Sequence, residues 1–181
     1  MNEFTAQLNL PIVIDEVDFA KYRALDKKQI RCENTILKQE THDWLRAQLS
    51  LEIQWLEIFC LTPYNKHIIH CDGHEIDTKA KINYIIGGEG SSMMWYKAAD
   101  ENKIVKGISK ANTRYLTIAE KDAVEVYSKQ LQGFNIVNVG RLHTVKNKAD
   151  HRYCISIAVA DSTSKLRLDY SELVDRCREY I

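Results

Sequence analysis

The sequence predicts a mainly β domain of the sandwich or jelly-roll class with flanking helices. Short segments rich in isoleucine, valine, tyrosine and tryptophan fill the middle of the chain, and glycine turns such as residues 87–90 separate several of them. Helical spacing of apolar residues is found towards the two ends. A doubly wound α/β fold is disfavoured, because no helices alternate with the middle strands.

The predicted strands occupy the central part of the chain. They cover residues 52–61, 80–86, 92–96, 135–139, 142–146 and 153–160. We therefore expect one domain spanning residues 1–181, with a helical region over about 1–50, a β core over about 52–160 and a helix over about 169–181.

The helical ends are predicted from spacing and capping residues. Phe19, Tyr22 and Leu25 recur at intervals of three after Asp18, and Thr41 is a candidate cap for a helix that carries Trp44, Leu45, Ala47 and Gln48. Near the other end, Asp169 and Glu172 have the spacing of a capping box at the start of an apolar helical stripe.

Composition narrows the classes of function. The chain has 181 residues and a formal net charge of zero, which disfavours nucleic acid or an anionic membrane as a partner. Its first residues have neither the basic start nor the long apolar core of a signal peptide. The five cysteines are widely spaced, as expected for buried, reduced thiols in a cytoplasmic protein.

The residues most informative about chemistry are His70 and Asp72. Positions two apart on a strand share a face, so these side chains could bind one metal ion, while Cys71 would point the other way. Chance alone gives about 0.4 such pairs in a chain of this composition. His67 and His74 flank the pair and are alternative ligands, although His74 and Asp77 lack the strand spacing.

The segment after residue 140 strengthens the metal hypothesis. His143, Val145 and Asn147 share one strand face. In the next strand the alternation separates an apolar face from a face of mostly small residues. The apolar face is Tyr153, Ile155, Ile157 and Val159, and the opposite face is Arg152, Cys154, Ser156 and Ala158. The second face suits a cavity wall across which an arginine reaches a ligand carboxylate.

The strand over residues 80–86 divides in the same way. Ile82, Tyr84 and Ile86 face one side, and Lys81, Asn83 and Ile85 the other. We expect Asn83 to line the cavity and Lys81 to lie nearer its rim.

Taken together, these motifs resemble the 2-oxoglutarate- and iron(II)-dependent dioxygenases. The chain has the order His-x-Asp, an INY strand, an MMWY strand and the pattern H-T-V-x-N-x4-R-x3-S. It is most similar to small phage and bacterial members near proline- and aspartyl/asparaginyl-hydroxylase-like sequences, over roughly residues 65–160. It departs from the aspartyl/asparaginyl branch at residues 81–83, where Lys-Ile-Asn replaces an Arg-x-His contact.

The resemblance implies a double-stranded β-helix and a role for each matching residue. His70, Asp72 and His143 would bind Fe(II), and Arg152 would pair with the distal carboxylate of 2-oxoglutarate. Ser156 and Asn83 would contact the co-substrate, and Asn147 would brace the loop after its strand. The implied reaction uses O2 to hydroxylate an unactivated C–H bond of an amino acid, a peptide side chain or another small molecule, with release of succinate and CO2.

Other interpretations remain open from the sequence. The chain could be a metal-dependent cupin enzyme that uses no 2-oxoglutarate, or a non-catalytic jelly-roll binding or structural module. Trp95 and Tyr96 could line a substrate pocket or belong to the core. Arg141 could face a substrate anion or lie in a solvated turn. The expected loops at the cavity mouth are residues 55–63, 87–92 and 98–112.

Overall fold

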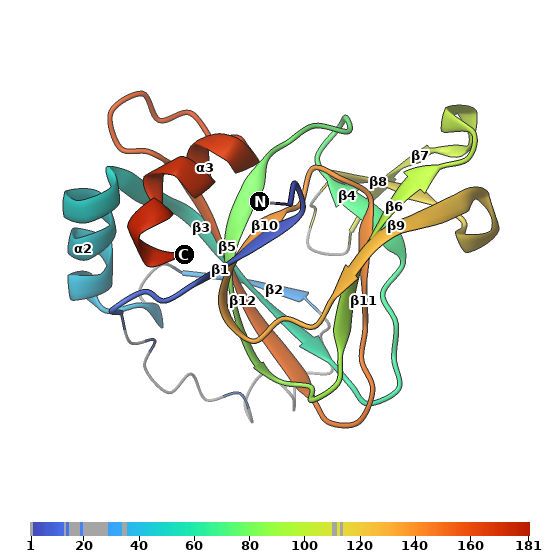
Figure 1. Ribbon diagram of the computed structural model, residues 1–181, viewed down its shortest axis with the longest axis horizontal. Coiled ribbons are helices and arrows are strands. Elements are labelled where there is room, and N and C mark those ends of the chain that lie inside the picture. Colours follow the sequence, from blue (N-terminus) through green and yellow to red (C-terminus); the bar gives the residue numbers. More distant parts are fainter. Residues whose placement is uncertain are drawn as a thin grey trace.

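Two antiparallel sheets of six strands each form the body of the computed structural model (Figure 1). The structure describes residues 2–12, 14, 19, 29–33, 36–109, 112 and 114–181. The strands are β1 (Thr5–Leu8), β2 (Gln29–Cys32), β3 (Leu51–Leu61), β4 (Ile69–Asp72), β5 (Ala80–Gly87), β6 (Ser92–Ala98), β7 (Val105–Ile108), β8 (Arg114–Ile118), β9 (Ala123–Lys129), β10 (Gly133–Asn138), β11 (His143–Lys146) and β12 (Arg152–Asp161). The helices are α2 (Gln39–Leu49), α3 (Tyr170–Arg176) and three short 3-10 turns, η2 (Glu101–Lys103), η3 (Glu120–Asp122) and η4 (Arg178–Tyr180).

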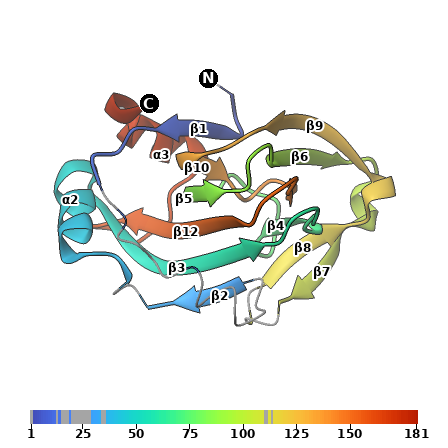
Figure 2. The same ribbon diagram turned by 90° about the horizontal axis from the view of Figure 1, so that it is seen from below.

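The chain passes back and forth between the two sheets. Sheet I has the strand order β1-β10-β5-β12-β3-β2, and sheet II has the order β7-β8-β4-β11-β6-β9. From β3 to β6 successive strands alternate between the sheets, and the alternation resumes from β10 to β12. Figure 2 shows the two groups of strands from below. All six predicted central strands are present within one or two residues of their expected bounds.

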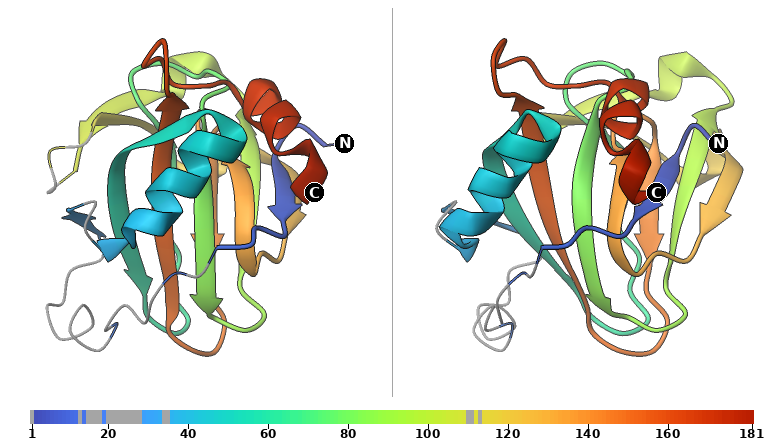
Figure 3. Two further views of the ribbon diagram at one scale, coloured as in Figure 1. Left: turned by 90° about the vertical axis from the view of Figure 1, so that its left-hand side faces the viewer. Right: turned by 60° about the vertical axis from the view of Figure 1, so that its left-hand side comes forward.

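The main hydrophobic core lies between sheet I and the helices. Figure 3 shows α2 and α3 on the outer side of this sheet. Ile155, Ile157 and Val159 of β12 pack in one cluster with Leu45 of α2 and Leu173 of α3. The alternation predicted for β12 is therefore confirmed, and it leaves the opposite face of the strand for the space between the sheets.

The two ends of the chain differ from their predictions in part. The expected helical region contains two strands, because β1 pairs with β10 and β2 pairs with β3 at the two edges of sheet I. The helix α2 begins at Gln39 with Lys38 as its N-cap, so Thr41 lies inside it rather than capping it. The helix predicted from Asp18 to Leu25 falls, apart from Phe19, outside the described residues. The Asp169–Glu172 capping box is confirmed at α3, which ends at Arg176, before η4.

Two expected mouth loops contain strand residues. Residues 55–61 belong to β3, whose backbone pairs with β12 on one side and with β2 on the other. The segment 98–112 contains η2 and β7, and β7 pairs with β8 at the edge of sheet II. Within the described residues, no helix combines the length and the apolar character needed to cross a membrane.

Candidate metal centre

Three predicted ligands meet between the two sheets. The ligand atoms of His70, Asp72 and His143 all lie within 4.8 Å of one another. His70 and Asp72 stand on the same face of β4, two positions apart, and His143 of β11 lies directly opposite His70 in the ladder. This gathering confirms the sequence-based grouping of these residues, and two imidazoles with one carboxylate are a donor set that could hold a divalent metal.

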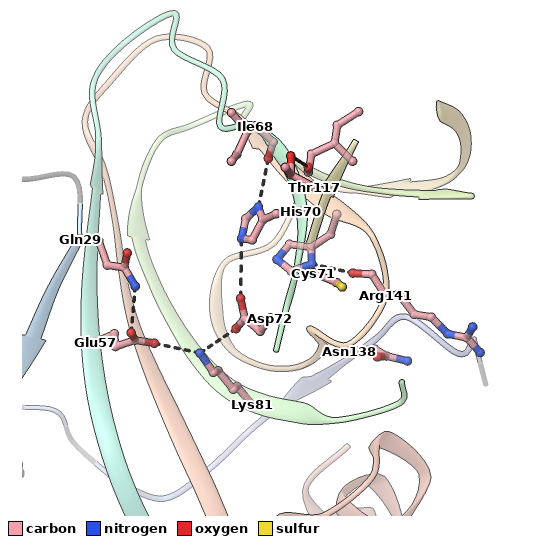
Figure 4. Close-up of polar contacts among 12 residues, drawn as sticks. Gln29, Glu57, Ile68, His70, Cys71, Asp72, Lys81, Thr117, Asn138 and Arg141 are labelled. Atoms are coloured by element: carbon pink, nitrogen blue, oxygen red, sulfur yellow. Dashed lines mark hydrogen bonds and ion pairs between the residues drawn. The ribbon is translucent and has the colours of Figure 1, made fainter. Parts of the chain in front are cut away.

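Each imidazole is oriented by its own backbone. Nδ1 of His70 lies 3.0 Å from the Ile68 carbonyl oxygen (Figure 4). Nδ1 of His143 lies 2.8 Å from the Arg141 carbonyl oxygen. A carbonyl can only accept, so both contacts require a proton on Nδ1 and leave the Nε2 lone pair free. Such contacts are the usual support of metal-binding histidines.

Burial and charge keep these groups in the protonation states that a metal needs. Burial, followed by the nearby His70, lowers the pKa of His143 to about 3, so its imidazole is neutral near pH 7. Burial raises the pKa of the Asp72 carboxyl, but the charge of Lys81, the two histidines and the hydrogen bond from Lys81 together hold that pKa well below its usual range. Neutral imidazole and ionised carboxylate are the metal-binding forms.

Asp72 also takes part in a buried ion-pair network. Lys81 Nζ lies 2.8 Å from Asp72 Oδ2 and 2.9 Å from Glu57 Oε2. Gln29 Nε2 donates to Glu57 Oε1 over 2.9 Å, which ties the network to the edge strand β2. Lys81 was expected near the cavity rim, but its relative exposure is only 2%, because the two carboxylates compensate its charge inside the protein.

Glu57 and Gln29 were not predicted from the sequence. Glu57 is 2% exposed and faces the space between the sheets from the middle of β3. A signal was present, because a lone glutamate interrupts the apolar run Leu56-Glu57-Ile58, as Lys81 interrupts β5. Opposite charges at buried positions of two strands predict an ion pair.

A cavity adjoins the three metal-binding candidates. It encloses about 550 Å³ of space free of protein atoms, including its opening to solvent. Asn83, Arg152, Cys154 and Ser156 line it, as the predicted strand faces required. Its apolar lining comes from Phe59, Leu61, Met93, Val139 and Val145, and His67 also lines the wall. Most of this apolar lining was not predicted from the sequence.

Arg152 is a buried cation that lacks a carboxylate partner within the described residues. Its relative exposure is 5%, and it contacts the Cys154 sulfur. Burial lowers the pKa of the guanidinium, but arginine remains protonated in proteins. The Asn83 side-chain oxygen in the same cavity is also buried without a hydrogen-bond partner. The guanidinium suits an anionic ligand, whereas the Asn83 oxygen can only accept and suits a ligand group or water that donates a hydrogen bond.

The remaining candidates lie away from the metal-binding group. Trp95 is fully buried in the core between the sheets, where its Nε1 donates to the Asn138 carbonyl oxygen, so the core interpretation is confirmed. Tyr96 and the Arg141 side chain line a separate hollow, and Arg141 lies 3.8 Å from Glu3. His74 contacts Arg114.

Asn147 braces the loop between β11 and β12. Its side-chain amide donates to the backbone oxygens of Leu61, Thr62 and Asp150. This is the role that the resemblance implied.

All five cysteines are thiols outside any disulfide, and four of them are buried, as expected from their spacing.

In comparisons with known proteins, no family model matches the chain and no curated protein matches it.

Proposed function

We propose that this protein is a 2-oxoglutarate- and Fe(II)-dependent dioxygenase with a double-stranded β-helix fold. The regular passage of the chain between sheets I and II supports that fold. The observation that carries the functional proposal is the combination, in one cavity, of the three metal-binding candidates with Arg152, a buried cation whose guanidinium has no carboxylate partner among the described residues.

The charges of the site match a dianion. Asp72 and Glu57 balance Lys81 and Arg152, so a bound divalent metal would leave two net positive charges in a largely buried region. A dicarboxylate such as 2-oxoglutarate would neutralise them, with one carboxylate near the metal and the other at Arg152. A cupin enzyme that uses no such co-substrate would gain nothing from a buried, unpaired guanidinium, which costs stability.

The chain supplies binding, orientation and exclusion of water. His70, Asp72 and His143 would hold the metal on one side and leave three of six octahedral positions open. The Arg152 guanidinium would fix the distal carboxylate, with Ser156 and Asn83 donating hydrogen bonds nearby. Phe59, Leu61, Met93 and Val145 would keep water from the reacting atoms. The bound iron would supply the activation of dioxygen for oxidation of a substrate C–H bond.

Succinate release tests this proposal. Protein loaded with Fe(II) under anaerobic conditions is mixed with 2-oxoglutarate and air, with and without panels of amino acids, peptides and small metabolites. We expect iron-dependent succinate formation by the wild type, none by His143→Ala, and wild-type activity of His74→Ala as the matched histidine control. Equal succinate formation by His143→Ala and the wild type would refute the site, and a metal-loaded wild type that binds no 2-oxoglutarate would favour the cupin alternative.

A further inference from the structure

The Asp72 carboxylate has its two oxygens in different environments. Oδ2 contacts the Lys81 ammonium at 2.8 Å, whereas Oδ1 lies 3.7 Å from His70 Nε2, among the metal-binding candidates. Figure 4 shows this division, with Lys81 between Asp72 and Glu57 and the His70 ring on the other side of the carboxylate.

Lys81 itself has little freedom to move. It is 2% exposed, and its second carboxylate partner, Glu57, is held by Gln29 from β2. If Asp72 turned to present both oxygens to a metal, the Lys81–Asp72 contact would break inside the protein. Breaking a buried ion pair is strongly unfavourable because it leaves a charge without compensation.

Carboxylates bind metals through one oxygen or through two. With single-oxygen binding by Asp72, an octahedral ion bound by the two histidines keeps three positions open. A chelating 2-oxoglutarate would need two of these and dioxygen the third. Binding through both Asp72 oxygens would leave only two open positions, and the co-substrate and dioxygen would then compete for them.

We propose that Lys81, anchored by Glu57, is a positioning residue that restricts Asp72 to single-oxygen metal binding and thereby keeps the third coordination position open. The need for an open third position rests on the proposed function. The restriction of Asp72 to one oxygen concerns the bound metal alone.

The test compares two variants loaded with Mn(II). Lys81→Met with Glu57→Gln removes both charges of the pair, so that neither is left buried alone, and it frees Asp72 Oδ2. Glu57→Gln alone keeps the Lys81–Asp72 contact and is the matched control. Water-proton relaxation reports the number of exchangeable waters on Mn(II), and calorimetry gives the affinities for Mn(II) and then for 2-oxoglutarate.

The double variant should bind Mn(II) as tightly as the wild type or more tightly, because a second oxygen joins the ion. Its relaxation enhancement should fall by about a third, from three open positions to two. With 2-oxoglutarate bound, the wild type should keep one exchangeable water on Mn(II) and the double variant none. Glu57→Gln should resemble the wild type in all three measurements.

Fewer exchangeable waters at an undiminished Mn(II) affinity separate positioning from general damage, which would weaken Mn(II) binding. Unchanged relaxation in the double variant, or a loss of Mn(II) affinity, would overturn the inference. The relaxation measurement needs no co-substrate. If wild-type Mn(II) protein bound no 2-oxoglutarate, the proposed function would be wrong. The relaxation measurement would still test whether Lys81 restricts Asp72 to one oxygen.

Discussion

His70 and His143 occupy directly opposed positions on β4 and β11, and their ring centroids lie 4.5 Å apart. In each residue Nδ1 contacts the carbonyl oxygen of the residue two positions earlier in the chain. Two strands that are distant in sequence therefore hold their imidazoles in the same way, each through Nδ1. Asp72, two positions after His70, completes the group.

Removing either histidine should abolish specific metal binding. We expect His70→Ala and His143→Ala to weaken Mn(II) or Fe(II) binding on the order of 100-fold or more, because two ligands hold a divalent ion poorly. His74→Ala is the control, since His74 contacts Arg114 outside the group. Calorimetry under anaerobic conditions measures the three affinities. A loss of metal affinity in His74→Ala equal to that in His143→Ala would show that the ligands are assigned wrongly.

Arg152→Met should separate co-substrate binding from folding. The methionine keeps much of the apolar stem and removes a buried cation that has no carboxylate partner in the described part of the chain. Hydrogen bonds to charged groups contribute about 1.5–3 kcal/mol each, so we expect 2-oxoglutarate to bind on the order of 100-fold more weakly. Mn(II) affinity should not change, and the midpoint of urea unfolding should not fall. Unaltered 2-oxoglutarate affinity in this variant would remove the main support for the proposed function.

Gly88 lies against the Arg152 side chain and should control its position. Its φ is +65°, and a Cβ added there would lie 2.5 Å from Arg152 Cβ and 2.8 Å from Arg152 Cγ. Gly133, with a φ of +62°, has no atom within 4 Å of such a Cβ. Alanine at either position should cost about 1–2 kcal/mol of folding free energy through backbone strain.

Only Gly88→Ala should also displace the guanidinium and weaken 2-oxoglutarate binding, by at least about tenfold. Urea unfolding and calorimetry on the two variants separate these effects. If Gly133→Ala weakened the binding of 2-oxoglutarate as much as Gly88→Ala does, strain rather than contact with Arg152 would be responsible.

Asp161, at the end of β12, should make folding sensitive to acid. Its side chain accepts hydrogen bonds from the backbone N–H of Ser164 and from Arg176, and these hold the pKa of the carboxyl below its usual range. A carboxyl whose pKa is lower in the folded state stabilises the protein above the unfolded pKa, and this contribution is lost as the pH falls further.

We therefore expect Asp161→Asn to be less stable than the wild type at pH 7, with the difference shrinking below about pH 4. Urea unfolding at pH 7, 5, 4 and 3 measures it, and Asp175→Asn, at an exposed ion pair with Arg178, serves as the control. A stability difference that stays constant from pH 7 to pH 3 would contradict this account.

The alternation of side chains along single strands determined much of this protein in advance. It assigned Ile155, Ile157 and Val159 to the core beneath the helices and Arg152 and Ser156 to the opposite face, because successive side chains on a strand must point to opposite sides. The same rule placed His70 with Asp72. These are local consequences of backbone geometry, so a single segment is enough to predict them.

The edge strands were not predictable in the same way. β1 and β2 are only four residues long, and each is a strand because a longer neighbour, β10 or β3, offers it backbone partners. Residues 55–61 were expected both in the strand over residues 52–61 and in the mouth loop over residues 55–63, and their pairing with β12 and β2 makes them strand. Strand formation there depends on hydrogen bonds to segments distant in sequence.

Tertiary structure alone decided which side chains meet. The sequence shows Glu57 and Lys81 as charges within apolar strands, but only the pairing of β3 and β5 with β12 brings them together next to Asp72. The sequence by itself determined that Arg152, Cys154 and Ser156 share the face that lines the cavity, because that follows from local alternation. The structure decided that Lys81 is buried against two carboxylates rather than near the rim, because its environment is set by strands far apart in the chain.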